Sequence, residues 1–296
     1  MKLVTFSCRG HSSIGKVVGN QVVDLPASDR GLPTTMRELL SGGAAIMQRA
    51  RDVSVDSGAA FPLADVRLEA PVPNPSKFLA IGMNYAKHAA EARQLGVQVP
   101  DSQVWFNKQV SCVNGPFDPV HMPRVSDNLD YEAELCVVIG KRCRHVSAAD
   151  ARSVIAGYMV CNDVSVRDWQ KRSATMTLGK SFNTTGPIGP WIVTDDDVAD
   201  PHNLNMRMLV NGKVRQEVNT SEMVYNVFDQ IAYLSTVMSL EPGDLLATGT
   251  PSGVGVAMNP PSWLQIGDVM RVEIDGIGYI QNTVIPEPSA LPFAAE

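Results

Sequence analysis

The sequence predicts a mostly β protein of the α+β class. Predicted strands outnumber long helices, and they do not alternate with helices in the βαβ order of a doubly wound parallel sheet. Three hairpin signals, each a pair of turn residues between apolar runs, lie at 19–20, 211–212 and 275–276. Since no internal repeat is present, a repeat architecture is not expected.

The first 70 residues are expected to form a small N-terminal β-rich domain. Short strands in hairpins are predicted for KLVTFSC and for SIGKVVGNQVVDL. A short helix is predicted in TTMRELLSGG, where Thr35 and Glu38 have the spacing of a capping box. The best linker candidate is EAPVPNPSK, with three prolines in nine residues. The predicted division is an N-terminal domain (1–70), a main domain (71–285) and a disordered tail (286–296).

The main domain begins with a buried strand, FLAIG, and a helix. Asn84 can cap this helix, YAKHAAEARQL, which Gly96 ends. The next two strands are DYEAELCVVIG and VIAGYMVCND, and the second ends abruptly in polar residues. A hairpin follows in LNMRMLVNGKVRQEV, and the clearest helix is TSEMVYNVFDQIAYLSTVMSL, whose apolar residues recur at helical spacing. The last elements are a strand that enters a glycine-rich loop, LLATGTPSGVG, and a hairpin in VMRVEIDGIGYIQNTV.

Composition argues against several classes of partner. The formal net charge of −6 and the lack of a basic run argue against nucleic acid. No apolar run reaches membrane-spanning length, so no membrane partner is expected. The five cysteines include no CxxC pair and are expected to be reduced thiols. The start, MKLVTFSCRGHSS, is expected to be a strand rather than a signal peptide, and the expected location is cytoplasmic.

Two glutamates open the strand DYEAELCVVIG. Because side chains alternate along a strand, Glu132 and Glu134 share one side, ahead of a stretch that is apolar on both faces. Two carboxylates a few ångströms apart repel by about 1 to 4 kcal/mol. A divalent cation, a shared proton or bulk water must offset this repulsion, and a solvated strand end is the simplest alternative.

Asp163 is the candidate for a third carboxylate ligand, at the polar end of VIAGYMVCND. It can also cap a following helix or pair with Arg167. If residues 163–170 form a helical turn, Asp163, Arg167 and Gln170 lie on one face. Three carboxylates without His or Cys suit Mg²⁺ or Mn²⁺ rather than Zn²⁺.

Three other polar groups are candidates for chemistry. His88 and Glu91 are spaced i, i+3, as a carboxylate that orients a general base requires, although Lys87 can instead pair with Glu91. Lys180 can oppose negative charge on a substrate oxygen, or it can be solvated. The loop ATGTPSGVG offers backbone N–H groups and hydroxyls such as that of Thr250 to a carboxylate, or it simply joins two strands.

A nucleotide site is not supported. The loop ATGTPSGVG does not fit the GxGxxG pattern. Ala174 occupies the position where a phosphate loop ending in Gly179, Lys180 and Ser181 requires glycine.

Taken together, these stretches resemble the fumarylacetoacetate hydrolase family. The matching motifs occur in order over about residues 71–285: IGMNYAKHAAE, DYEAELCVVIGKRCR, AGYMVCNDVSVRDWQ, GKSFNTTGPIGPWIV, VNGKVRQEVNTSEMVY and EPGDLLATGTPSGVG. The resemblance implies a catalytic domain of antiparallel β-sheets rolled around a metal site, usually assembled as a homodimer. Longer members have a further aspartate ligand upstream, for which this sequence offers no clear position. The chain therefore resembles the shorter branch of acylpyruvate hydrolases and related decarboxylases or isomerases.

The resemblance also implies roles for individual residues. It implies Mg²⁺ or Mn²⁺ held by Glu132, Glu134 and Asp163. It implies a water-activating pair, on a helix that orders as a lid in relatives, and a cation beside the substrate: His88, Glu91 and Lys180. It implies substrate contacts from Tyr85, Arg167, Gln170 and Thr250.

The expected activity is metal-dependent cleavage of a carbon–carbon bond in a 2,4-dioxo acid of the acylpyruvate type. The products are pyruvate and a carboxylic acid, formed through an enolate that the metal stabilises, in the catabolism of aromatic or related compounds. The alternative on the same site is a decarboxylase of oxaloacetate-type 2-oxo acids, or an isomerase. A rival of another class is a non-catalytic protein with a structural ion, which would lose folding stability on chelation.

Overall fold

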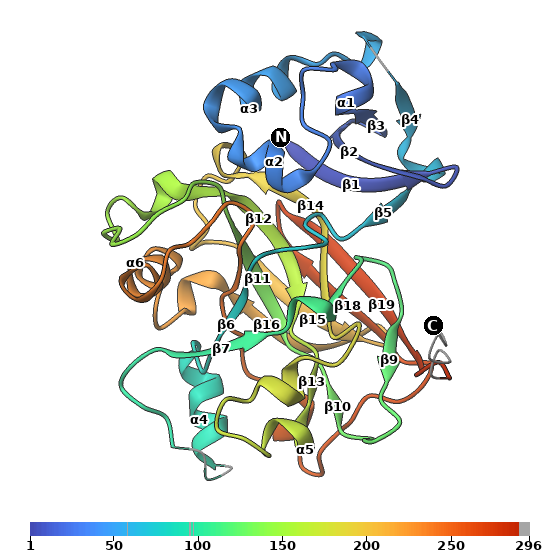
Figure 1. Cartoon of the computed structure of the whole chain (residues 1–296). Helices are drawn as coiled ribbons and strands as arrows, with labels where there is room; N and C mark the ends of the chain where they lie inside the picture. The colour runs from blue at the N-terminus through green and yellow to red at the C-terminus, as the bar shows by residue number, and fades with distance from the viewer. Residues whose placement is uncertain (58, 95, 97, 290–296) are drawn as a thin grey trace, which may run out of the picture.

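The structure is a computed structural model that describes residues 1–57, 59–94, 96 and 98–289. The predicted mostly β class is confirmed, because most of the described elements are strands of large mixed sheets. The N-terminal segment lies at one end of the molecule, and helices α4 and α5 lie at the other (Figure 1). The helices are α1 (Leu25–Ser28), α2 (Met36–Ser41), α3 (Gly43–Asp52), α4 (Ala86–Gln94), α5 (Arg167–Gln170) and α6 (Val227–Val237).

The largest sheet crosses the whole molecule. Ten of its strands follow one path: β4 (Ala60–Pro62), β3 (Gln21–Asp24), β2 (His11–Val18), β1 (Lys2–Cys8), β14 (Gly186–Thr194), β12 (Ile155–Asn162), β11 (Ala133–Ile139), β17 (Leu245–Ala247), β6 (Phe78–Gly82) and β7 (Val104–Lys108). Off this path, β5 (Arg67–Glu69) pairs with β1 and β8 (Val113–Asn114) pairs with β14. The central strands β11 and β12 are fully or almost fully buried, as their apolar sequences on both faces require.

The remaining strands form two smaller sheets. The five-stranded sheet has the order β16 (Lys213–Asn219), β15 (Asn205–Val210), β18 (Val269–Ile274), β19 (Gly278–Pro286) and β9 (Val120–Met122). The two-stranded sheet joins β10 (Leu129–Asp130) to β13 (Ser165–Val166). The pairs β6–β17, β8–β14 and β9–β19 are parallel, so the sheets are mixed rather than purely antiparallel.

The N-terminal strands continue the main sheet. Antiparallel pairing of β1 with β14 matches Lys2 with Val193 and Leu3 with Ile192. The proline-rich segment after Glu69 contains no helix or strand, as expected, but it packs into the core: Val72 is fully buried, and the Thr5 hydroxyl donates to the Pro71 carbonyl at 2.8 Å. The domain boundary at residue 70 stays a prediction.

Local sequence signals explain most of the element boundaries. The Thr35 hydroxyl caps α2 by accepting from the Glu38 backbone N–H at 3.3 Å. The hairpin of β15 and β16 turns at Asn211 and Gly212, whose positive φ angles of 51° and 74° match a primed turn. Helix α6 begins later than the apolar pattern suggested, because Asn226 and Asp229 form its capping box.

One predicted cap is wrong. The amide of Asn84 does not cap α4. It donates to the carbonyls of Tyr225 and Thr248 at 2.9 and 2.8 Å and accepts from the Tyr225 backbone N–H at 2.8 Å. Asn84 therefore fixes the start of α4 to segments that lie more than 140 residues later in the chain.

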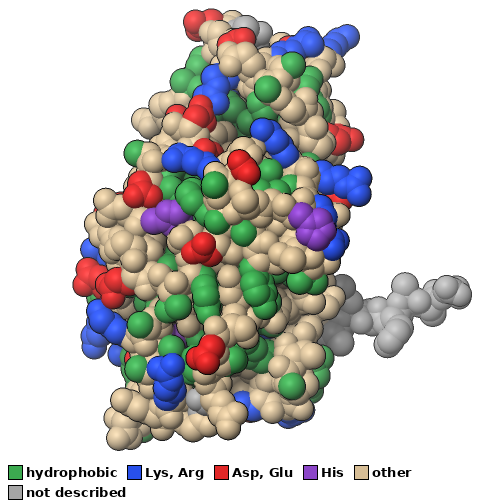
Figure 2. Space-filling model, turned by 90° about the vertical axis from the view of Figure 1, so that its left-hand side faces the viewer, with side chains coloured by type: hydrophobic (Ala, Val, Ile, Leu, Met, Phe, Trp, Pro, Cys, Tyr) green, Lys and Arg blue, Asp and Glu red, His purple; other side chains and the backbone are tan. Residues whose placement is uncertain are grey.

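The predicted tail is partly contradicted. Strand β19 runs to Pro286, and the Glu287 backbone N–H donates to the Met122 carbonyl at 3.1 Å. The last part of that prediction, 290–296, lies outside the described residues. Among the residues described, no helix is long and apolar enough to cross a membrane. All five cysteines are free thiols, as expected. Figure 2 shows one face, on which acidic and basic side chains are interspersed.

Candidate metal centre and active site

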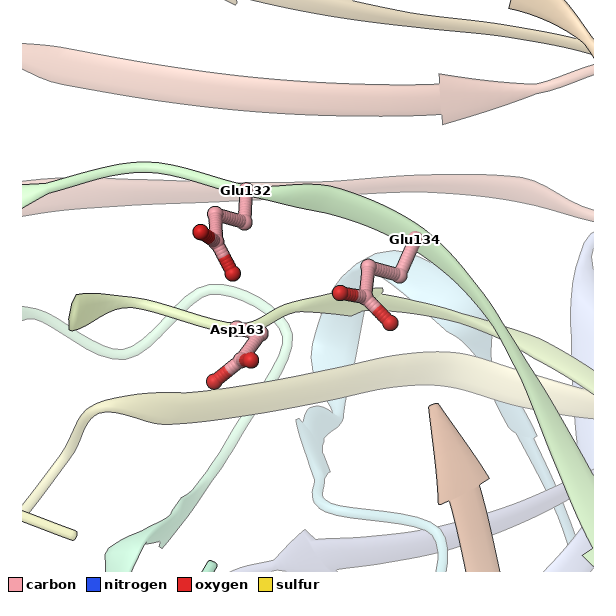
Figure 3. Close-up of side chains that lie close together, drawn as sticks. All are labelled: Glu132, Glu134 and Asp163. Atoms are coloured by element: carbon pink, nitrogen blue, oxygen red, sulfur yellow. The ribbon is translucent and has the colours of Figure 1, made fainter. Parts of the chain in front are cut away.

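Three carboxylates meet at the ends of β11 and β12, and we call Glu132, Glu134 and Asp163 the acidic triad. Ala133, the first residue of β11, lies opposite Asn162, the last residue of β12. Glu132 directly precedes Ala133 and Asp163 directly follows Asn162, so the two are neighbours. One carboxylate oxygen from each residue lies within 4.8 Å of the others. The exposed fractions are 4%, 1% and 0%, so bulk water does not separate the charges. Figure 3 shows Glu132 and Glu134 on one strand, pointing to the same side, with Asp163 on the neighbouring segment below them.

Cationic side chains surround two members of the triad. The Lys180 ammonium lies 2.5 Å from a Glu132 oxygen and 2.7 Å from an Asp163 oxygen. The Arg167 guanidinium lies 2.7 Å from the other Glu132 oxygen. Burial opposes ionisation of Glu132, but these two cations outweigh it and lower the pKa of this carboxyl to about 2.

Glu134 is in a different environment. Its carboxylate accepts the Gly249 backbone N–H at 2.7 Å, and it makes no ion pair with any described side chain. Burial first, and then the charges of Asp163 and Glu132, raise the pKa of Glu134 well above its ordinary value. A divalent cation beside Glu134 would remove this conflict.

The residues present therefore fit a divalent metal ion. Three buried carboxylate oxygens converge, and hard oxygen ligands are what Mg²⁺ and Mn²⁺ prefer. In the part of the chain that the structure describes, this is the only group of three or more potential ligand side chains.

Two residues that sequence reasoning missed hold the centre in place. The buried Lys108 ammonium lies 2.7 Å from Asp163 and donates to the Lys180 carbonyl at 2.6 Å. The Asp130 carboxylate accepts from the Arg167 side chain and from the Gly255 backbone N–H, both at 2.8 Å. The sequence held a signal for the buried position of Lys108. Strand alternation places this lysine on the same side of VWFNK as the apolar Phe106.

The predicted helical face for Asp163, Arg167 and Gln170 is wrong. Residues 165–166 form β13, and helix α5 begins only at Arg167. Asp163 therefore neither caps α5 nor pairs with Arg167. The contact between Arg167 and Gln170 does form, because the guanidinium donates to the Gln170 amide oxygen at 3.0 Å.

The pair of His88 and Glu91 forms on α4. Nδ1 of His88 lies 3.3 Å from a Glu91 oxygen, and Glu91 also accepts from the Gly253 backbone N–H at 3.1 Å. The alternative pairing of Lys87 with Glu91 does not occur, since Lys87 lies 3.0 Å from Glu222. Glu91 thus ties the imidazole and α4 to the glycine-rich loop.

One cavity of about 260 Å³, which we call the site cavity, is lined by two glutamates of the acidic triad and by His88, whereas Asp163 and Glu91 are not among its lining residues. It is lined by Ile81, Gly82, Met83, His88, Ala92, Phe106, Glu132, Glu134, Arg167, Gln170, Lys171, Met176, Lys180, Thr250 and Val256. The Thr250 hydroxyl accepts from the Gln216 amide at 2.9 Å, so its own proton is available to a ligand. Tyr85 is not among the lining residues. It is buried in the core, and its proposed substrate contact stays a prediction.

A larger groove of about 580 Å³ lies elsewhere, between β5, β14 and β19. Its described lining is mostly apolar, and its Arg67 and Asp118 neutralise each other at 2.8 Å. The converging charged groups lie in the smaller site cavity, so the chemistry is assigned there.

The fold and the acidic triad define a mostly β protein with a candidate centre for a divalent metal. Residues 77–285 match the C-terminal domain of fumarylacetoacetate (FAA) hydrolase. The chain belongs to the fumarylacetoacetate hydrolase family.

Several relatives carry the name oxaloacetate tautomerase. The mitochondrial oxaloacetate tautomerase fahd2 of Xenopus laevis is 43% identical over 269 residues, which are 90% of this chain and 83% of that protein. The mitochondrial oxaloacetate tautomerase FAHD2A of Homo sapiens is also 43% identical over 269 residues, with 90% and 85% covered.

Solved structures of the family share the fold. The fumarylacetoacetate hydrolase of Exiguobacterium antarcticum has a TM-score of 0.85 and 36% identity, covering 97% of this chain and all of that one. The maleylpyruvate hydrolase of Sphingobium sp. SYK-6, in complex with manganese(II) and pyruvate, has a TM-score of 0.81 and 34% identity, with the same coverage.

Proposed function

We propose that the protein is a divalent-metal-dependent enzyme that interconverts the keto and enol forms of an oxaloacetate-type 2-oxo acid. One observation carries the proposal: Glu132 and Glu134 of the acidic triad line the same cavity as His88, whose imidazole contacts Glu91. The names of the relatives at 43% identity support this substrate and this reaction. They favour the isomerase alternative over acylpyruvate hydrolysis, which was the main expectation from sequence.

The residues of the acidic triad would hold Mg²⁺ or Mn²⁺. When bound, this ion would take the carboxylate and keto oxygens of a 2-oxo acid and make the carbon next to the ketone more acidic. The Lys180 ammonium lies beside Glu132. Its positive charge stabilises the negative charge that develops on the keto oxygen.

His88 is the proposed proton carrier. Because Nδ1 faces Glu91, Nε2 is left to take a proton from the substrate carbon and to return one to the enol oxygen. Glu91 stabilises the imidazolium that forms between these two steps. The reverse sequence converts the enol to the ketone, so no other reactant is needed.

Hydrolysis of a 2,4-dioxo acid is the second candidate. The same His88 would then activate water, and the likeness to a maleylpyruvate hydrolase favours this reading. Decarboxylation of the same type of substrate uses the same acidified carbon and stays an alternative.

A substrate panel separates these reactions. The Mn²⁺-loaded protein is mixed with oxaloacetate, and the enol absorbance and the release of pyruvate are followed together; acylpyruvates are then tested for pyruvate release. Fast enol–keto conversion with little pyruvate supports the proposal. If the protein cleaves acylpyruvates but does not change the rate of oxaloacetate enol–keto conversion, the proposed tautomerase function is wrong and the protein is a hydrolase.

Replacing His88 with alanine is expected to lower the rate of tautomerisation by about 10²- to 10⁴-fold, the usual contribution of a general acid–base group. Metal affinity should stay near that of the wild type, because His88 is not a member of the acidic triad. The matched control is Lys87→Ala, since Lys87 is the adjacent exposed residue of α4. An unchanged rate in His88→Ala would place the base elsewhere.

The homodimer also stays a prediction. So does the cytoplasmic location, since the names of the relatives place them in mitochondria.

A further inference from the structure

Four side chains that can carry positive charge line the site cavity: His88, Arg167, Lys171 and Lys180. Three of them, His88, Arg167 and Lys180, pair with carboxylates, with nitrogen–oxygen distances of 2.5 to 3.3 Å. Lys171 differs, because its ammonium makes no ion pair or hydrogen bond with any residue in the described part of the chain. Of the described cations that line the cavity, it is the one that a ligand can pair with at no cost to an existing ion pair.

Lys171 lines the cavity and is exposed to solvent. It directly follows α5, and its backbone N–H donates to the Arg167 carbonyl at 3.3 Å. Residues at i and i+4 of a helical turn share a face, with Cβ atoms about 5–6 Å apart. Arg167 is buried and contacts Glu132, whereas Lys171 is exposed. Arg167 is therefore the cation that contacts the acidic triad, and Lys171 is the neighbouring cation that solvent can reach.

Apart from its charged side chains, the site cavity offers a charged group few polar side chains, chiefly those of Gln170 and Thr250. Met83, Ala92, Met176 and Val256 make much of the remaining lining apolar. A second carboxylate on a substrate would lose hydration there unless it met a cation. The net charge of −6 also disfavours a dianion, so a local positive charge is needed to attract one.

We propose that Lys171 is a specificity-determining residue that binds the distal carboxylate of a dicarboxylic 2-oxo acid. This inference rests on the proposed function, in which the other end of the substrate binds at the acidic triad. It separates a dicarboxylate from an acylpyruvate whose distal group is apolar, because only the former gains an ion pair.

The test compares two ligands that are not turned over, malate and lactate. Both present a carboxylate and a neighbouring hydroxyl to a metal, and only malate has a distal carboxylate. Calorimetry on the full, Mn²⁺-loaded chain gives the ratio of the lactate Kd to the malate Kd. In Lys171→Met this ratio should fall by roughly two- to five-fold, the range of a solvent-exposed ion pair. Lys171→Arg should keep it.

The matched control is Arg172→Met. Arg172 is the adjacent cation, but it does not line the site cavity, and its guanidinium stacks on Trp169 at 3.7 Å. This variant loses the same charge and should keep the wild-type ratio. An unchanged ratio in Lys171→Met, with lactate still bound in a Mn²⁺-dependent manner, overturns the role of Lys171 and leaves the proposed function standing. If neither acid binds the loaded wild type, both proposals fail.

Discussion

Glu134→Gln is expected to abolish metal-dependent activity while it leaves the metal-free fold intact. Loss of a residue outside the coordination sphere already costs 10- to 100-fold in metal affinity, so loss of a ligand should cost more than about 100-fold. The fold should tolerate the change, because Glu134 has no cationic partner among the described residues and a glutamine oxygen can still accept the Gly249 N–H. Calorimetry with Mn²⁺ measures the affinity.

Denaturant unfolding in chelator measures the fold. We expect the free energy of unfolding of Glu134→Gln to stay within about 1 kcal/mol of the wild type, since one neutral hydrogen bond contributes about that much. Wild-type Mn²⁺ affinity in this variant would remove Glu134 from the metal site. A collapse of stability would instead show that its charge supports the metal-free fold.

Asp163→Ala is expected to lose both metal binding and stability. The Asp163 carboxylate forms ion pairs with the ammonium groups of Lys108 and Lys180, each at 2.7 Å, and all three side chains are buried. Burial acts to lower the pKa of Lys108, but Asp163 outweighs it and raises that pKa. Without Asp163, Lys108 becomes a buried charge without a carboxylate partner, which typically costs about 3–5 kcal/mol. Unfolding in urea, with chelator present, measures the loss.

A double variant separates the two effects. Lys108→Met combined with Asp163→Ala removes the stranded charge, so it should recover part of the stability but none of the metal affinity. If Asp163→Ala alone is as stable as the wild type in chelator, the ion pair with Lys108 does not stabilise the fold.

The sequence predicted the elements whose causes are local. The cap at Thr35 and the turn at Asn211 and Gly212 depend on neighbouring residues, and both occur where they were expected. Asn84 has the composition of a helix cap, yet its partners are Tyr225 and Thr248. No local pattern contains that information.

The acidic triad was predictable because its members lie at the ends of two recognisable strands. Its supporting charges were harder to predict. Lys108 and Asp130 meet Asp163 and Arg167 across separations of 55 and 37 residues. The alternative in which Asp163 pairs with Arg167 does not occur, because the short strand β13 separates Asp163 from α5.

Removal of the metal tests the central claim most directly. The purified protein is treated with chelator, its melting temperature and its rate of oxaloacetate enol–keto conversion are measured, and Mg²⁺ or Mn²⁺ is then restored. We expect the conversion to stop without metal and to return with either ion, while the melting temperature changes modestly. Full conversion in the stripped protein would contradict the claim, and unfolding on chelation with no conversion in either state would show that the ion is structural.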